Sequence, residues 1–123
     1  MLLHIEESQI DPDIALVQLS GKLALGRESL RVEAIIDDLT KTGRIRAILD
    51  MSGVNYIDSA GVGLVALGGG KLKEAGGKLV VVTGEGRVRD LLRITQIDQI
   101  VAVYPTVEEA ASQFGATRPP ASA

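Results

Sequence analysis

The chain has 123 residues and a formal net charge of −3 at pH 7, and 46% of its residues are hydrophobic. That length supports one domain, and the composition is that of a folded globular protein rather than a disordered one. The absence of Cys and the single His exclude Cys-based zinc sites, disulfide frameworks and His-dependent triads, while three aromatic residues and an acidic balance argue against nucleic-acid binding.

The first part of the chain predicts a β-hairpin followed by a helix. Two short apolar segments, Leu3–Ser8 and Ile14–Leu19, flank the turn-forming residues Asp11-Pro12-Asp13. From Glu28 to Lys41, apolar residues recur at i, i+3, i+4 and i+7, which is typical of an amphipathic helix. These apolar positions are Val32, Ile35, Ile36 and Leu39.

The middle of the chain predicts a βαβ unit. Arg46–Met51 and Lys78–Thr83 are short and nearly continuous in apolar residues, as expected of strands buried on both faces. A helical segment, Ala60–Ala75, separates them, so the two strands should pair in parallel through a right-handed crossover.

The last part predicts a short helix over Gly86–Arg93, a strand over Ile100–Tyr104 and a helix over Val107–Phe114. We therefore expect an α/β fold, with a mixed sheet, an N-terminal hairpin and about four helices packed on the sheet. This single domain should span residues 1–114, and we expect residues 115–123 to form a disordered tail.

Ligand sites in such sheets lie outside the carboxyl ends of the parallel strands, which directs attention to residues 50–59. Asp58 and Ser59 precede the apolar helix, so one of them is expected to be its N-cap. A hydroxyl at a helix start is also a candidate phosphorylation site, because oriented backbone donors lie beside the new charge. The two interpretations are compatible, and the local pattern does not separate them.

The run LDMSGVNYIDSAGVGLVALGGGKLKEAGGKLVVV, residues 49–82, resembles the signature of the STAS domain, and of bacterial anti-sigma factor antagonists in particular. Leu19-Ser20-Gly21-Lys22-Leu23 is similar to the family's hairpin exit. The resemblance implies that Ser59 is phosphorylated by a partner that is both a serine kinase and an anti-sigma factor. Many phosphorylated members carry an acidic residue after this hairpin exit, where this chain has Ala24.

The helix after Ser59 gives a candidate partner surface. If Val62, Val65, Ala66 and Gly69 form the stripe that packs on the sheet, then Leu64 and Leu67 point away from it. The alternative is that a neighbouring helix covers both leucines. The predicted partner-binding residues are Asp58, Ser59, Gly61, Leu64 and Leu67.

The resemblance to the STAS domain implies two alternative functions. One is an anti-sigma factor antagonist that is released from its partner when Ser59 is phosphorylated. The other is a constitutive interaction module of a stressosome-like scaffold or a lipid-transporter complex. In both, we expect a cytoplasmic protein without catalytic activity, cofactor, metal or membrane insertion, and the sequence does not predict its oligomeric state.

Four other features of the sequence have competing interpretations. A response-regulator receiver needs acidic residues after its first strand and a Lys after its last, and the chain has neither. Asp50 and Asp58 are a conceivable acid/base pair, although such carboxylates more often cap turns and helices. Gly68–Gly70 lacks the rest of a P-loop, and implies a helix kink or a close contact. Arg87, Arg89 and Arg93 form either an anion-binding face or, more simply, a solvated one.

Overall fold

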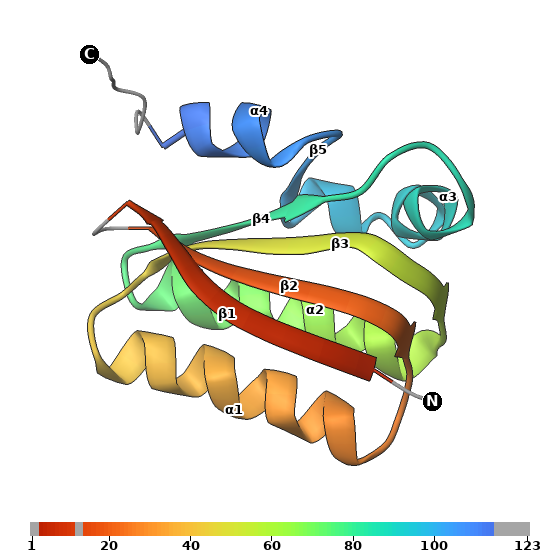
Figure 1. The fold of residues 1–123 in the computed structure, drawn as a ribbon, viewed down its shortest axis with the longest axis horizontal. Coiled ribbons are helices and arrows are strands. Elements are labelled where there is room, and N and C mark those ends of the chain that lie inside the picture. Colours follow the sequence, from red (N-terminus) through yellow and green to blue (C-terminus); the bar gives the residue numbers. More distant parts are fainter. Residues whose placement is uncertain (1–2, 12–13, 115–123) are drawn as a thin grey trace.

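A five-stranded sheet in the order β1-β2-β3-β4-β5 forms the centre of the computed structural model, which describes residues 3–11 and 14–114 (Figure 1). The strands are β1 (Leu3–Asp11), β2 (Ile14–Leu23), β3 (Arg46–Ile57), β4 (Lys78–Val82) and β5 (Ala102–Tyr104). The helices are α1 (Arg27–Lys41), α2 (Ser59–Glu74), α3 (Arg87–Ile94) and α4 (Val107–Ser112), and a 3₁₀ turn covers Ile97–Gln99.

The predicted α/β fold, with its hairpin, mixed sheet and four helices, is confirmed. β1 and β2 pair antiparallel, whereas the pairs β2–β3, β3–β4 and β4–β5 are parallel. The parallel pairs follow from the strand-helix-strand order of the chain. The expected tail at residues 115–123 and part of the expected hairpin turn, Pro12-Asp13, lie outside the described residues.

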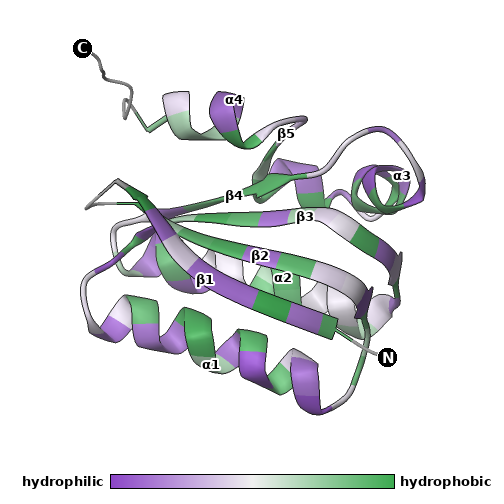
Figure 2. Ribbon diagram, in the orientation of Figure 1, coloured by the Kyte–Doolittle hydropathy of each residue, from purple (hydrophilic) through white to green (hydrophobic). Residues whose placement is uncertain are grey.

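The sheet has a hydrophobic core on each face. α1 and α2 cover one face, and α4 packs on the other over β3, β4 and β5 (Figure 1). Alternate residues of β3 enter the two cores: Leu49 lies in the core beneath α1 and α2, and Ile48 in the core that includes Ala110 of α4. β3 and β4 are accordingly apolar over most of their paired length, whereas α1 is polar on its outer side (Figure 2).

Three strands are longer than predicted. β1 continues past Ser8 to Asp11, and the extensions of β2 and β3 change the nature of the segment at residues 50–59. β2 continues to Leu23 and β3 to Ile57, because Ser20–Leu23 pairs with Gly53–Ile57 across two register shifts. The expected loop at 50–59 is therefore strand for most of its length. The sequence signal was weak because this part of β3 is largely polar and its exposed residues come in pairs, Ser52-Gly53 and Asn55-Tyr56, instead of alternating with buried ones.

α2 is an uninterrupted helix through Gly68–Gly70, so close packing rather than a break accounts for two of these glycines. A Cβ on Gly68 would lie 2.7 Å from Ile36 Cδ1, and one on Gly69 would lie 2.6 Å from Val101 Cγ1. Nothing lies within 4 Å of the corresponding position at Gly70. None of the helices in the described part of the chain has the length and apolar character needed to cross a membrane.

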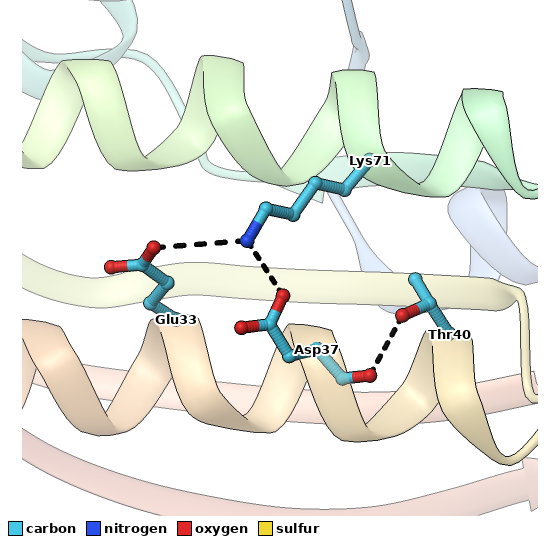
Figure 3. Close-up of polar contacts among 4 residues, drawn as sticks. All are labelled: Glu33, Asp37, Thr40 and Lys71. Carbon is cyan, nitrogen blue, oxygen red and sulfur yellow. Dashed lines mark hydrogen bonds and ion pairs between the residues drawn. The ribbon is translucent and has the colours of Figure 1, made fainter.

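An ion-pair cluster links α1 to α2 (Figure 3). Lys71 Nζ lies 2.6 Å from Asp37 Oδ1 and 3.7 Å from Glu33 Oε2. The hydrogen bond to Asp37 raises the pKa of Lys71, which keeps the ammonium charged. All three side chains are partly exposed, so the cluster fixes the register of the two helices more than it stabilises the fold.

Two neighbouring glycines of α2 should respond oppositely to Ala. Gly70→Ala should raise the free energy of unfolding by up to about 1 kcal/mol, since Ala is the better helix former and the position is open. Gly69→Ala should lower it, because the added methyl meets the stiff, buried Val101 and such overpacking costs about 1–3 kcal/mol. Urea unfolding of the two variants measures both changes, and a stabilised Gly69→Ala variant would contradict the close contact.

Candidate functional site

Asp58 is the N-cap of α2, which resolves the alternative that the sequence left open. Its Oδ1 accepts a hydrogen bond from the Gly61 N–H at 2.9 Å, and its Oδ2 accepts one from the Leu25 N–H at 3.3 Å. The Gly61 hydrogen bond is the main reason why the pKa of Asp58 lies below its usual value of 3.8. One carboxylate therefore joins the start of α2 to the loop that leaves β2.

The end of β2 approaches the same junction through its backbone. The Leu23 carbonyl accepts a hydrogen bond from the Asp58 N–H at 3.3 Å. A Cβ on Gly61 would lie 2.3 Å from that carbonyl oxygen, so only glycine fits there. Gly61 is buried, and its role in the structure is to let α2 pack closely against β2.

Ser59 is the first residue of α2 and is exposed. Its hydroxyl makes no hydrogen bond with any residue that the structure describes. The neighbouring loop presents Leu25, of which 79% is exposed, and the half-buried Ala24. Within the described part of the chain, the Ser59 hydroxyl is therefore unengaged at a helix start, and position 24 carries no carboxylate.

The two leucines that we expected to point away from the middle of the α2 stripe differ in exposure. Leu67 is 43% exposed, but Leu64 is 8% exposed and belongs to the core beneath α1 and α2, so its predicted exposure is wrong. The alternative, that both leucines are covered, is also wrong for Leu67. The buried stripe of α2 is wider than the periodicity suggested. It includes Gly61, Leu64, Val65, Gly68 and Leu72. The two glycines let α2 approach Leu23 of β2 and Ile36 of α1 closely, so that Leu64 is buried as well.

Asp50, the other carboxylate singled out in the sequence, is buried and hydrogen-bonded within the sheet. Its Oδ1 accepts bonds from the Ser52 hydroxyl at 2.6 Å and the Ser52 N–H at 3.0 Å, and its Oδ2 accepts one from Gln18 Nε2 at 3.3 Å. These bonds satisfy a buried charge, which is its structural role. Among the described residues, no three His, Asp or Glu side chains gather to hold a metal ion.

The arginines of α3 differ in their contacts. Arg93 forms ion pairs with Asp90 at 3.2 Å and Glu85 at 3.8 Å. Arg89 Nε is buried without a hydrogen-bond partner, and Arg87 is exposed. The three therefore do not offer one set of unpaired cations, since Arg93 is already paired with carboxylates of its own segment.

Comparison with known proteins gives a consistent result. The model of the STAS domain family matches residues 7–110. A protein named "putative anti-sigma factor antagonist" from Thermotoga neapolitana is 28% identical over 102 residues, 83% of this chain and 90% of the relative.

Two solved structures share the fold. One has the same designation and comes from Thermotoga maritima, with a TM-score of 0.80 at 23% identity, covering 89% of this chain and 92% of that one. The phosphorylated form of SpoIIAA, a Bacillus cell fate determinant, has a TM-score of 0.72 at 19% identity, covering 90% of this chain and 99% of that one.

The carboxylate of Asp58 should make stability depend on pH. Because the pKa of Asp58 is lowered in the folded state, its contribution is complete above the ordinary value of 3.8 and is lost as pH falls through the folded-state pKa. Asp58→Asn removes the acceptor for the Leu25 N–H and should lower the free energy of unfolding at pH 7. Urea unfolding from pH 7 downward should show this deficit shrinking in acid.

Asp38→Asn is the matched control, because the Asp38 side chain is exposed and has no hydrogen bond or ion pair with the described residues. It should show no such pH-dependent deficit. A deficit of Asp58→Asn that stays constant well below pH 3.8 would contradict the role of the ionised carboxylate.

Proposed function

The chain belongs to the STAS domain family, and from this premise we propose that it is an anti-sigma factor antagonist. In this proposal it binds an anti-sigma factor that is also a serine kinase, and phosphorylation of Ser59 releases it. The protein is then the substrate and the ligand of its partner and not itself an enzyme. The proposal puts both proteins in the cytoplasm, where the kinase has ATP.

One observation carries the proposal: the Ser59 hydroxyl is exposed and free at the start of α2, while its neighbours are engaged. Asp58 caps the helix and Gly61 is held against the Leu23 carbonyl. A kinase would therefore reach the hydroxyl without displacing any contact among the described residues. One of the solved structures that share the fold is the phosphorylated form of SpoIIAA, which supports the proposal.

The new charge acts more strongly at an interface than within the fold. A phosphoserine carries about −1.5 to −2 charges at neutral pH. The helix N-terminus favours such an anion by about 0.3–1 kcal/mol, which the neighbouring Asp58 partly offsets, so the fold should tolerate it. Across an interface, a like charge at roughly 6 Å costs on the order of 3 kcal/mol at an effective dielectric near 20. That cost weakens binding roughly 100-fold.

Substitution of Ser59 tests the switch. With the cognate kinase and ATP, Ser59→Ala should stay bound, and Ser59→Asp should bind more weakly than the wild type. Ser8→Asp is a matched control, because Ser8 is exposed on β1, on the far side of β2 from β3. Affinity is measured by calorimetry, and circular dichroism should be nearly unchanged in all three variants.

Phosphorylation of the purified protein by the kinase tests the Ser59 switch directly. If the purified kinase and ATP leave the protein unmodified, or modify a residue other than Ser59, the switch is wrong. Ala24, which stands where many phosphorylated relatives carry an acidic residue, then favours the alternative, a constitutive interaction module of a stressosome-like scaffold or a lipid-transporter complex. In that case, Ser59→Ala and wild type bind the partner equally with and without ATP.

The two leucines of α2 give an internal comparison for the partner surface. Leu67→Lys should weaken binding of the anti-sigma factor and leave the melting temperature within a few degrees, because Leu67 is partly exposed. Leu64→Lys should instead lower the melting temperature severely, since it buries a charge in the core. Calorimetry and thermal unfolding separate the two effects. If a folded Leu67→Lys variant binds the anti-sigma factor as well as the wild type does, Leu67 is not part of the partner-binding surface.

A further inference from the structure

A second surface lies on the other side of β3 from β2. β3 pairs with β4 only as far as Asp50 and Val82, whereas it pairs with β2 up to Ile57. Along the rest of β3, α3 takes the place of a neighbouring strand (Figure 1). The second half of β3 is therefore bordered by a strand on one side and by a short helix on the other.

Two adjoining clefts lie between this part of β3 and α3. One has a volume of about 320 Å³ and the other about 400 Å³. Both are lined by Asn55, Arg87 and Val88, so they form one elongated depression, which we name the β3–α3 groove. Its length along a strand suits an extended chain better than a compact small molecule.

The β3–α3 groove has an apolar floor and exposed apolar walls. Val88 is buried at its base, and the half-buried Leu91 lies beside it. Tyr56 is 49% exposed and Ile94 76% exposed, from opposite sides of the groove. Aromatic side chains are enriched at the centres of interfaces, and Tyr56 is one of three aromatics in this chain.

Among the described residues, two cations beside the groove have no acidic partner. Arg93 already forms ion pairs with both carboxylates of this rim, Glu85 and Asp90. Arg87 forms no ion pair with the described residues. Lys22 Nζ lies 5.6 Å from the centroid of the Tyr56 ring, where it makes a cation–π contact instead of an ion pair.

We propose that the β3–α3 groove binds an extended segment of a protein partner in which apolar and acidic residues alternate. The apolar side chains of that segment cover Tyr56, Leu91 and Ile94, and its carboxylates pair with Arg87 and Lys22. In an extended chain, successive side chains point to opposite sides, so alternation presents one kind to the floor and the other to the rim. The inference goes beyond the proposed function, because it needs neither Ser59 nor a kinase.

The test is an NMR titration of the full chain with two capped peptides, Ac-Leu-Glu-Leu-Asp-Leu-Glu-NH2 and its basic counterpart Ac-Leu-Lys-Leu-Lys-Leu-Lys-NH2. The acidic peptide should give saturable shifts at the amides of residues 55–57 and 87–94, and added salt should weaken its binding. The basic peptide should bind more weakly. Equal binding of both peptides, no saturable shifts, or shifts confined to α1 and α2 would each overturn the proposal.

Three variants sharpen the result. Arg87→Gln should weaken the acidic peptide about two- to fivefold, the size of one exposed ion pair, and Ile94→Ser should weaken it through lost apolar contact. Arg46→Gln is the matched control, because Arg46 is exposed at the opposite end of β3 and should leave the affinity unchanged. Equal effects of Arg87→Gln and Arg46→Gln would overturn the role of Arg87. Because no phosphorylation enters this experiment, its failure leaves the Ser59 switch standing, and the reverse also holds.

Discussion

The close approach of α2 to the Leu23 carbonyl is the contact on which the arrangement around Ser59 depends. It requires a residue without a side chain at Gly61, and it brings Asp58 within reach of the Leu25 N–H. Three separate segments, the end of β2, the end of β3 and the start of α2, are thereby fixed at one point. Through the Asp58 carboxylate, the junction links the exposed Leu25 to the helix start at which Ser59 lies.

The same junction explains why β3 presents different surroundings on its two sides. β2 follows β3 up to Ile57 because Leu23 is held at the start of α2. β4 ends much earlier, at Val82, and the chain then turns into α3. Because β4 ends before β2 does, the second half of β3 has no neighbouring strand on its β4 side. α3 covers this edge of β3 only in part, and the β3–α3 groove lies along the uncovered part.

Much of the fold followed from the sequence, because apolar periodicity and turn residues specify elements that lie in the core. Every helix and strand was anticipated, with α1 and the start of β4 within a residue of their observed bounds. Features that depend on packing between elements were not. The polar second half of β3 carries no strand pattern of its own, and Leu64 was misplaced because the depth of α2 is set by glycine contacts with other segments. The groove has no local signal at all, since its walls come from β3 and α3.

At the candidate site, the sequence placed the N-cap of α2 at Asp58 or Ser59, and the structure assigns it to Asp58. Asp58 uses both carboxylate oxygens to accept backbone hydrogen bonds, so its charge is directed into the junction. Ser59 contributes nothing to those contacts, so modifying its hydroxyl changes the surface charge and leaves the hydrogen bonds of the junction intact. In the proposed switch, a phosphate on Ser59 would therefore act on a partner through electrostatics and not through a change of fold. Asp58 carries the structural hydrogen bonds and Ser59 carries none among the described residues, and this separation is what would make a serine at this helix start suitable for reversible modification.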